Sequence, residues 1–533
     1  MHHHTRDLIA TNRCDVLVVG AGPAGLTAAI TLARYGIDVL LIEKHRGTSP
    51  FPKATGVSTR TMELFRSWGI EQQIRAGSMR VRPVMTFART LLDESVLAVP
   101  FGYPTDEQAL TQSPCTPCCC AQDHLEPVLL QHLYGVGGRV RFGVELVDLV
   151  DTGDAVLATI RDETTAAVER VEAAYVIGAD GPRSTVRAAA GIGIEDLGTI
   201  GDFVSVTFRA HLTHRLAGLP AAINTVEMPG AEGVFVPTSR DDRWIYARQW
   251  HPETGERIDD WTPQHCVELI RAASGAADLL PDILAVQPFV MGGHLADSFA
   301  AGRTFLVGDA AHRTTPVGGT GMNTAIHAAH NLGWKLAWVL RGWAGVDLLG
   351  SYEQERRPIG ASNVLRSLRR GPGPEQDPDA GLAGDIGVRY RSDVIHEVES
   401  TDETTGVVPG VRAPHAWVQA DGGCRSTLDL FDGGLTVLTG PDGDGWHRAV
   451  REIAAQGIPI RAVMIGRDLQ DSNGDVARQY RLGAQAAVLI RPDGYVACRC
   501  ESAAGDPAAL LGAAVSMALG REPVSAVGLL RAS

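Results

Sequence analysis

One stretch near the start of the chain, residues 14–44, restricts the fold more than any other. It reads CDVLVVGAGPAGLTAAITLARYGIDVLLIEK: a short apolar strand, the pattern Gly20-x-Gly22-x-x-Gly25, an Ala- and Leu-rich helix and a second apolar strand. Glycines at these positions allow a tight turn and let the helix N-terminus approach a pyrophosphate. The stretch therefore predicts a Rossmann-like unit that binds a dinucleotide.

The acid at the end of the second strand narrows the choice of dinucleotide. Glu43 can accept a hydrogen bond from an adenosine ribose 2′-hydroxyl and would repel a 2′-phosphate, which favours FAD or NAD over NADP. Pro23 and Ala24 in the turn, and Lys44 after the strand, adjoin these residues and are candidate cofactor contacts.

A second strand–loop–helix stretch spans residues 302–331, GRTFLVGDAAHRTTPVGGTGMNTAIHAAHN. Asp309 ends the predicted strand, where its carboxylate can bind hydroxyl groups. The helix expected to begin near Gly321 offers unpaired N–H groups and a partial positive charge. This arrangement suits a polyhydroxylated ligand whose other end becomes an anion, as in reduced flavin. Taken alone, the pattern is also typical of an ordinary corner with a capping aspartate.

Composition excludes several classes of protein. With 44% hydrophobic and 21% charged residues, the 533-residue chain is typical of a soluble globular protein with two to four domains. A net charge of −14 disfavours binding to nucleic acid or to anionic membranes. No apolar run reaches membrane-spanning length, and the start of the chain lacks a secretory pattern, so a cytoplasmic location is expected.

Nine cysteines, an odd number, favour reduced thiols in this setting. Four of them cluster at Cys115, Cys118, Cys119 and Cys120. Adjacent cysteines cannot easily all bind one tetrahedral ion, and no second pair stands at zinc spacing. Small buried side chains are therefore favoured over a metal site, and no metal is expected.

Three motifs that stand far apart in the sequence could contact one and the same FAD molecule. They are GAGPAG with Glu43, a strand that ends in Asp180-Gly181, and GDAAHRTTPVGGTGMN. Together they resemble the FAD-dependent aromatic hydroxylases, the single-component monooxygenases typified by para-hydroxybenzoate hydroxylase. The pieces RGWAGVDLLGSYEQERRP, APHAW, STLDLF and LIRPDGYVA resemble members that tailor natural products, such as polyketide hydroxylases and the rebeccamycin-pathway flavoenzyme.

The predicted fold class is α/β: a Rossmann-like FAD-binding domain, an inserted antiparallel-sheet substrate domain, and a C-terminal thioredoxin-like domain without CxxC. Alternating strands between 200 and 292 indicate the insertion, and a β-α-β-β-β-α order after 405 indicates the last domain. The predicted boundaries are 1–80, 111–195 and 293–370 for the FAD-binding domain, 81–110 and 196–292 for the substrate sheet, 371–404 for a linker, and 405–533 for the C-terminal domain.

The resemblance assigns roles to particular residues. It places Gln122 at the middle of the cofactor, Asp309 at the ribityl chain, and Asp180 and Arg183 in a fingerprint for FAD and the nicotinamide cofactor. The full set of candidate cofactor residues is Gly20, Gly22, Pro23, Ala24, Gly25, Glu43, Lys44, Lys53, Gln122, Asp180, Asp309, Pro316, Gly319, Thr320, Gly321, Met322 and Asn323, with Arg183 for NAD(P)H.

Two positions depart from the family pattern. Lys53 stands where the family usually has arginine, and lysine cannot make the same planar two-point contact. His327-Ala328-Ala329 stands where the family usually has Gln-Asp-Ala. The second departure removes an acid, which bears on one local hydrogen bond and not on the class of protein.

The implied activity is a monooxygenase that uses FAD, NADPH or NADH, and O₂. A flavin C4a-hydroperoxide would hydroxylate an electron-rich ring, of phenol or hydroxypyridine type, in an aromatic natural product. Baeyer–Villiger chemistry, oxidative decarboxylation, and a flavin-binding protein without turnover remain alternatives. No catalytic side chain is assigned, and assembly as a homo-oligomer is compatible with the sequence.

The substrate is expected between the flavin loop and the inserted sheet. Pro316 would contribute from the loop, and Phe235 and Arg248 from the sheet, where Arg248 would favour a phenolate. The alternative for Arg248 is an exposed strand residue that is paired with an acid.

Overall fold

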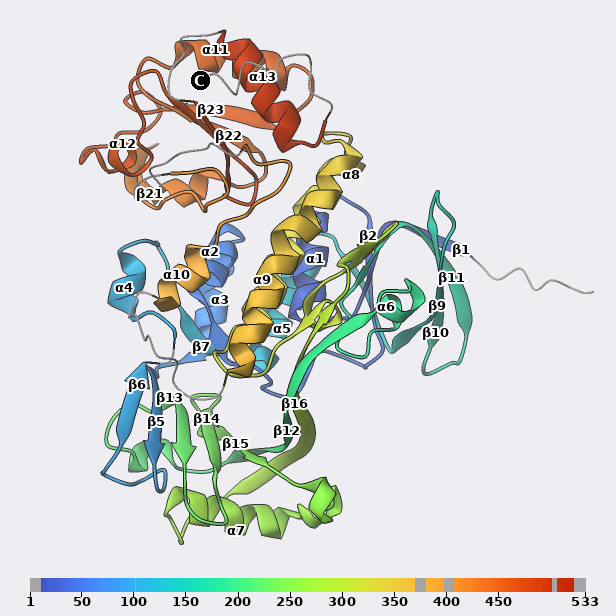
Figure 1. Cartoon of the computed structure of the whole chain (residues 1–533), viewed down its shortest axis with the longest axis vertical. Coiled ribbons are helices and arrows are strands. Elements are labelled where there is room, and N and C mark those ends of the chain that lie inside the picture. The colour runs from blue at the N-terminus through green and yellow to red at the C-terminus, as the bar shows by residue number, and fades with distance from the viewer. Residues whose placement is uncertain are drawn as a thin grey trace, which may run out of the picture.

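The computed structural model describes residues 11–100, 102–369, 380–396, 407–420, 422–500 and 506–521. Three parts follow one another along the long axis of the molecule (Figure 1). A helix-covered sheet lies in the middle, an antiparallel sheet with helix α7 (Pro263–Ser274) lies at one end, and the C-terminal domain lies at the other. The predicted α/β fold class is confirmed.

The central sheet has the order β17-β18-β11-β1-β2-β8, with β10 and β9 extending from β11. Strand β1 pairs in parallel with both β2 and β11, and β11 pairs in parallel with β18. The carboxyl ends of these strands therefore meet at one edge, where open α/β sheets bind ligands. The strands are β1 (Thr11–Val19), β2 (Val39–Glu43), β8 (Arg139–Phe142), β9 (Val144–Asp151), β10 (Val156–Asp162), β11 (Val168–Gly178), β17 (Ala300–Ala301) and β18 (Thr304–Leu306).

Helices cover this sheet and supply its core together with the strands. Helix α1 is buried from Ala24 to Ala33, as expected for a helix rich in alanine and leucine that packs against α5 and α8. Helix α8 is buried along most of its 20 residues. The helices of this part are α1 (Pro23–Arg34), α2 (Thr59–Ser67), α3 (Glu71–Ala76), α4 (Asp106–Leu110), α5 (Gln122–Gly135), α6 (Thr185–Ala189), α8 (Gly321–Leu340) and α9 (Gly350–Leu368).

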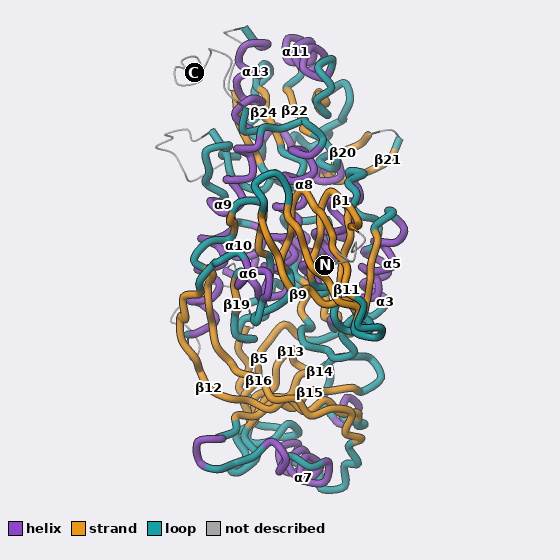
Figure 2. The backbone as a smooth tube through the Cα atoms, turned by 90° about the vertical axis from the view of Figure 1, so that its right-hand side faces the viewer, coloured by secondary structure: helices purple, strands orange, loops and turns teal. Residues whose placement is uncertain are grey.

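The second large sheet has the order β19-β16-β12-β15-β14-β13-β5-β6. Helix α7 covers the face that is turned away from the central sheet, as Figure 1 shows, and its Ile270 packs against Phe208 and Tyr246. Seen from the side, the long strands β12 and β16 connect this sheet to the rest of the molecule (Figure 2). The strands are β5 (Arg82–Ala88), β6 (Leu97–Pro100), β12 (Ile194–Arg209), β13 (Ala221–Val226), β14 (Gly233–Pro237), β15 (Arg243–Gln249), β16 (Asp282–Ala296) and β19 (His312–Arg313).

The C-terminal domain contains a four-stranded sheet with the order β23-β22-β24-β25, in which only β22 and β23 are parallel. Its buried Cys498 and Cys500 lie on the last strand, and not at the turn between the first strand of the sheet and its following helix. The elements are β20 (Trp417–Ala420), β21 (Gly423–Ser426), β22 (Leu435–Thr439), α11 (Asp444–Ala454), β23 (Ile460–Met464), α12 (Asp475–Gln479), β24 (Ala487–Ile490), β25 (Val496–Cys500) and α13 (Pro507–Ala518).

Two smaller features differ from a simple domain plan. The segment predicted as a linker contains helix α10 (Ala380–Ile386), where the Asp385 carboxylate accepts a hydrogen bond from Arg60 N at 3.1 Å; the rest of that prediction lies partly outside the described residues. A three-stranded sheet places β7 (Cys118–Cys120) between β3 (Gly56–Val57) and β4 (Ser78–Met79). Within the described ranges, every helix is too short or too polar to cross a bilayer.

Candidate functional site

Of the three glycines in the turn between β1 and α1, Gly22 alone has free space beside its Cα, where a ligand could lie. Gly20 has φ 106°, and a Cβ there would lie 2.3 Å from the Ala179 carbonyl oxygen. A Cβ at Gly25 would lie 1.9 Å from the Gly20 carbonyl oxygen, because α1 closely approaches the turn. At Gly22, no such neighbour lies within 4 Å of the Cβ position, and this residue precedes α1 without a side-chain cap. The exposed helix N-terminus can therefore receive a pyrophosphate.

Glu43 is held beside this turn. Its Oε2 accepts a hydrogen bond from Ala21 N at 2.9 Å, and its Oε1 accepts one from His45 N at 2.9 Å. The His45 ring nitrogen Nδ1 lies 2.5 Å from the same Oε1. A carboxylate has about four acceptor positions, so a lone pair remains on Oε2 for a ribose hydroxyl. Lys44 is exposed next to it.

The charge of Lys53 acts on two acids that stand far apart in the sequence. Burial raises the pKa of Glu126 and of Asp309, and the positive charge on Lys53 opposes the shift at both carboxyls. Glu126 accepts hydrogen bonds from Ser49 N at 2.7 Å and from Gln122 Nε2 at 2.6 Å. The structure therefore brings Lys53, Gln122 and Asp309 into one neighbourhood, although Gln122 is engaged by Glu126.

Asp309 lies in the 3-10 turn Gly308–Ala310 that follows β18. Its side chain is exposed to solvent, and desolvation by the surrounding protein raises the pKa of its carboxyl group. Two side chains hold the backbone carbonyl groups of this turn. His294 Nε2 lies 3.2 Å from Asp309 O, and Arg187 Nη1 donates to Ala310 O at 2.9 Å. The carboxylate is thus positioned to accept hydrogen bonds from ligand hydroxyls.

The N-terminus of α8 lacks a side-chain cap, because Thr320 makes no capping hydrogen bond. The loop before it turns through Gly318 and Gly319, which have φ values of 82° and 63°. A Cβ at Gly321 would lie 2.5 Å from Thr314 Oγ1, so a larger residue here would displace the threonine hydroxyl. Pro316 is exposed on this loop. The uncapped N–H groups and the helix dipole can stabilise a negative charge at the edge of a ligand.

The side-chain amide of Asn323 is hydrogen-bonded within the protein. Its Oδ1 accepts hydrogen bonds from Ser58 N at 2.9 Å and Thr61 Oγ1 at 2.8 Å. Its Nδ2 donates to Gly56 O and Tyr103 Oη, both at 3.0 Å. The amide therefore joins α8 to α2 and to the segment after β6, and Met322 beside it is buried. A direct contact of either side chain with a cofactor stays a prediction.

Asp180 stabilises the N-terminus of the short helix α6, whose N-cap residue is Ser184. Its carboxylate accepts hydrogen bonds from Ser184 Oγ at 2.5 Å and from Val186 N at 3.1 Å. Arg183 is exposed, whereas Arg187 is buried and donates to Pro182 O at 3.0 Å as well as to Ala310 O. Arg187 thus links the Asp180 turn to the Asp309 turn, while a role for Arg183 in binding NAD(P)H stays a prediction.

These residues fit FAD. The open position at Gly22 accommodates a pyrophosphate, Asp309 offers a carboxylate for hydroxyl groups, and the uncapped end of α8 suits an electron-rich ring edge. Gly22 and Asp309 follow the carboxyl ends of the central-sheet strands β1 and β18, and α8 begins after the loop that continues from the Asp309 turn.

Comparisons with known proteins agree with this geometry. Residues 13–367 match the family described as FAD binding domain, and residues 407–522 match the family described as aromatic-ring hydroxylase, C-terminal. The chain belongs to the FAD-dependent aromatic-ring hydroxylases. The predicted family is confirmed.

Individual relatives match this hydroxylase over nearly its whole length. Aklavinone 12-hydroxylase from Streptomyces purpurascens is 37% identical over 526 residues, which cover 93% of this chain and 97% of that protein. The ternary complex of aklavinone-11 hydroxylase with FAD and aklavinone has a TM-score of 0.87 at 35% identity, covering 95% and 99% of the two chains. The substrate-free rebeccamycin biosynthetic enzyme has a TM-score of 0.79 at 30% identity, covering 96% and 99%.

The two sheet residues expected to line the substrate site of this hydroxylase point the other way. Phe235 is 0% exposed and lies in the core beneath α7, in contact with the Tyr246 ring at a centroid distance of 4.9 Å. Arg248 shares this face; its Nη1 donates to Gly230 O at 2.8 Å, and its Nη2 lies 3.9 Å from Glu232 Oε2. The expectation for both residues is therefore corrected, because α7 occupies the face to which they belong.

Sequence reasoning missed two residues that hold the flavin-site framework of the hydroxylase together. Tyr103 donates to Gly319 O at 2.8 Å, and the tyrosine stands in a segment without any recognisable pattern. His327 is the first residue of the His-Ala-Ala triplet that replaces the usual Gln-Asp-Ala of the family. Its Nε2 lies 2.9 Å from Thr61 Oγ1. This contact ties α8 to α2, so a local hydrogen bond is made despite the missing acid.

Proposed function

We propose that this hydroxylase uses NADPH or NADH together with O₂ to hydroxylate an electron-rich ring, of phenol or hydroxypyridine type, in an aromatic natural product. FAD, once reduced and supplied with O₂, provides an electrophilic oxygen atom. The relatives named for aklavinone, one of them in complex with FAD and aklavinone, support this class of substrate.

The observation that carries the proposal is the path of the loop at residues 314–320. The loop leaves β19 at one edge of the substrate sheet and enters α8. At the other edge, Tyr103 follows β6 and donates its hydroxyl to Gly319 O at 2.8 Å. The loop is therefore attached to both edges of the sheet, and it holds the N-terminus of α8 beside the face that α7 leaves uncovered.

That face is mostly apolar: Ser205, Thr207 and Thr225 are polar members of it, and its apolar residues form a wall. The cross-strand register places Val236 opposite Ile245 and Val234 opposite Ala247. Because side chains alternate along a strand, these residues point away from α7. The half-buried members of the wall are Met85, Phe87, Ile223, Val234, Val236, Ile245 and Ala247. Partly exposed apolar side chains of this kind suit the surface of a flat aromatic ring.

The protein's own residues would bind and orient rather than react. Asp309 would hold the hydroxyl-bearing chain of FAD, and the α8 N-terminus would stabilise negative charge at the ring edge. The loop with Pro316 and the apolar wall would enclose the substrate ring and exclude water from the transfer. Lys53 would add positive charge near the middle of the cofactor.

The test is turnover by the FAD-loaded protein with a panel of phenolic polycyclic natural products under ¹⁸O₂. We expect substrate-stimulated NAD(P)H oxidation and a product that is heavier by one ¹⁸O atom, located on a ring carbon by NMR. An ester or lactone product would indicate Baeyer–Villiger chemistry, and loss of CO₂ would indicate oxidative decarboxylation. FAD binding without stimulated oxidation across the panel would contradict the proposed hydroxylation.

A further inference from the structure

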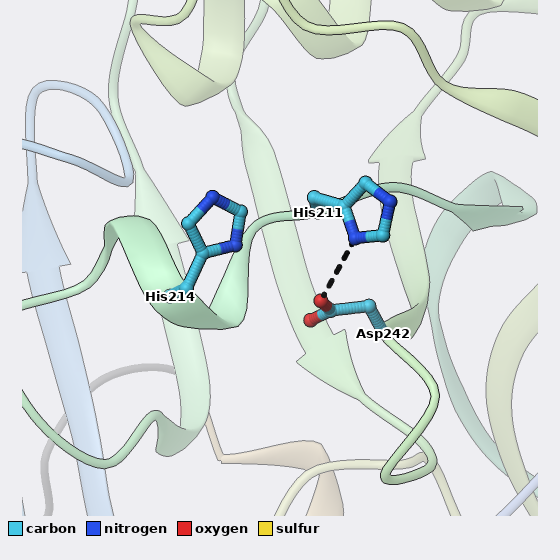
Figure 3. A group of neighbouring side chains, drawn as sticks. All are labelled: His211, His214 and Asp242. Carbon is cyan, nitrogen blue, oxygen red and sulfur yellow. Dashed lines mark ion pairs between the residues drawn. The ribbon is translucent and has the colours of Figure 1, made fainter.

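Two histidines and an aspartate converge at the surface of the substrate domain, far along the chain from the flavin motifs. His211 and His214 follow β12, and Asp242 precedes β15 (Figure 3). One ligand atom from each residue lies within 4.8 Å of the others, and His211 Nδ1 is 3.7 Å from Asp242 Oδ2. We propose that these three side chains bind one divalent transition-metal ion of the Zn²⁺ or Ni²⁺ type.

The backbone holds the carboxylate toward the histidines. Asp242 has φ 55°, a left-handed conformation that asparagine and aspartate adopt more readily than most residues. Thr213 N donates to Asp242 Oδ1 at 2.9 Å, and Ala210 N donates to Asp242 O at 3.1 Å. These two hydrogen bonds connect the segment of the histidines to the turn of the aspartate, and they leave Oδ2 on the side of His211.

The arginines that adjoin the cluster are paired with other carboxylates. Arg209 lies 2.9 Å from Asp241, and Arg215 lies 2.8 Å from Asp278. Arg243, directly after Asp242, forms a two-point pair with Asp123 of α5 at 2.6 and 3.1 Å. The negative charge of Asp242 is therefore not directed to these three arginines, which leaves it for a cation.

The donor set determines the kind of ion. Two imidazoles and one carboxylate suit borderline ions such as Zn²⁺ and Ni²⁺, whereas Mg²⁺ and Ca²⁺ prefer oxygen ligands. Ligands at about 2.1 Å around a tetrahedral ion stand about 3.4 Å apart, so the side chains must close by about 1 Å. His211 and His214 are exposed and can rotate to do so. Water can complete the coordination, as it does where three protein ligands leave a position open.

Binding would act on a joint between two parts of the protein. The turn that carries Asp242 contacts the FAD-binding domain on both sides: Arg240 Nε donates to Ser78 O at 2.5 Å, and Arg243 pairs with Asp123. An ion that joins this turn to the segment after β12 would stiffen the attachment of the substrate sheet. The measurable consequence is a higher unfolding temperature with the ion than without it.

The experiment uses the full-length FAD-loaded protein with His2, His3 and His4 replaced by alanine, because the MHHH start can bind the same ions. Calorimetric titrations with ZnCl₂ and NiCl₂ should each give one site, and the unfolding temperature should rise. In that background, His211→Ala combined with His214→Ala should abolish the site. Asp242→Asn, which keeps an acceptor for Thr213 N, should weaken binding by about tenfold or more, as removal of even outer-shell partners of a metal does.

The matched control is His265→Ala, which removes another exposed histidine of the same sheet domain and should leave the titration unchanged. Retention of the site in the His211→Ala, His214→Ala variant would overturn the proposal, and so would the absence of any binding in the parent protein. Equal losses in the control variant would show that the ion binds surface histidines in general. FAD content, read from the flavin absorbance, separates these outcomes from failure of the hydroxylase itself.

Discussion

Arg491 and Glu355 form a completely buried two-point ion pair that joins the C-terminal domain to helix α9. The guanidinium nitrogens Nη1 and Nη2 lie 2.6 and 2.9 Å from the Glu355 oxygens, and both side chains are 0% exposed. Lys335 of α8 donates to the same carboxylate at 2.8 Å, and Asp493 accepts from Arg491. Every charge in this network has an opposite partner. The network therefore couples the C-terminal domain to α9 and to α8, and the N-terminus of α8 is part of the candidate flavin site.

Removing the negative charge of Glu355 should show how much this network contributes to the free energy of unfolding. In Glu355→Gln, the charges of Arg491 and Lys335 remain buried without their shared carboxylate, which should cost about 3–5 kcal/mol of unfolding free energy. The midpoint of denaturant unfolding measures the change. Glu452→Gln, on the exposed side of α11, is the matched control and should change stability by less than about 0.5 kcal/mol. An unaltered midpoint in Glu355→Gln would contradict the structural role of the pair.

Gly22→Ala separates cofactor binding from folding. No neighbouring atom lies within 4 Å of the added Cβ, and Gly22 has φ −72°, so the apoprotein should keep its unfolding temperature. FAD affinity should fall by about 1.5–3 kcal/mol if the methyl group disturbs charge-assisted hydrogen bonds to the pyrophosphate. Fluorescence titration of the apoprotein with FAD measures the loss. In Gly20→Ala, by contrast, folding itself should suffer, since the Cβ would lie 2.3 Å from a carbonyl oxygen.

Asp309→Ala should also lower FAD affinity, by about 1.5–3 kcal/mol, because hydrogen bonds between a carboxylate and the ribityl hydroxyls are lost. The same titration reports the change. Asp297→Ala removes an exposed acid shortly before β18 and should leave FAD binding unaffected. Full FAD affinity in Asp309→Ala would remove this residue from the cofactor site.

The parts of the site that the sequence predicts correctly are those set by local chemistry. A strand, a glycine turn and a helix in about 30 residues specify their own geometry, and so the turn at Gly22 could be read directly. In the C-terminal domain, the order β22, α11, β23, β24, β25, α13 followed from alternation and turn residues in the same way, whereas α12 and the strands β20 and β21 were not predicted. These features depend little on what packs against them.

The features that the sequence could not predict depend on packing between segments that are far apart in the chain. Alternation correctly grouped Phe235 with Pro237, but only the position of α7 decides which face of the sheet is the core. Tyr103 reaches Gly319 across 216 positions of the chain, and no local pattern marks a tyrosine for that contact. Asn323 was assigned to the cofactor from its motif, yet its amide is engaged by α2 and by Tyr103.

The two faces of the substrate sheet should respond differently to truncation. Phe235→Ala opens a cavity beneath α7 and should cost about 3–5 kcal/mol of stability. Ile245→Ala, on the half-buried wall, should raise the KM for the aromatic substrate and uncouple NAD(P)H oxidation from product formation, with a smaller effect on unfolding temperature. Steady-state kinetics with product quantification and thermal unfolding of both variants measure the contrast. Unchanged KM and coupling in Ile245→Ala would place the substrate elsewhere.

His312 should make the protein sensitive to acid. It is buried between Phe299, at a ring distance of 5.8 Å, and Gly360 of α9. Burial, aided by the charge of Arg356, lowers its pKa to about 3. In the unfolded chain a histidine titrates near pH 6.5, so between about pH 6.5 and 3 the unfolded state binds a proton that the folded state does not. Stability must therefore fall as the pH falls through this window, by up to about 1.4 kcal/mol per pH unit for this residue.

Replacement of the ring tests this directly. His312→Leu keeps an apolar side chain at the buried position and removes the titrating group, so the loss of unfolding temperature between pH 6.5 and 4.5, about two units inside that window, should be smaller than in the parent protein. His330, whose pKa burial also lowers to about 3, remains in both proteins, so part of the acid sensitivity should persist. His265→Ala, which removes an exposed histidine, should leave the pH profile unchanged. If the unfolding temperatures of His312→Leu and of the parent protein, each saturated with FAD, change identically with pH, His312 does not contribute to the loss of stability in acid.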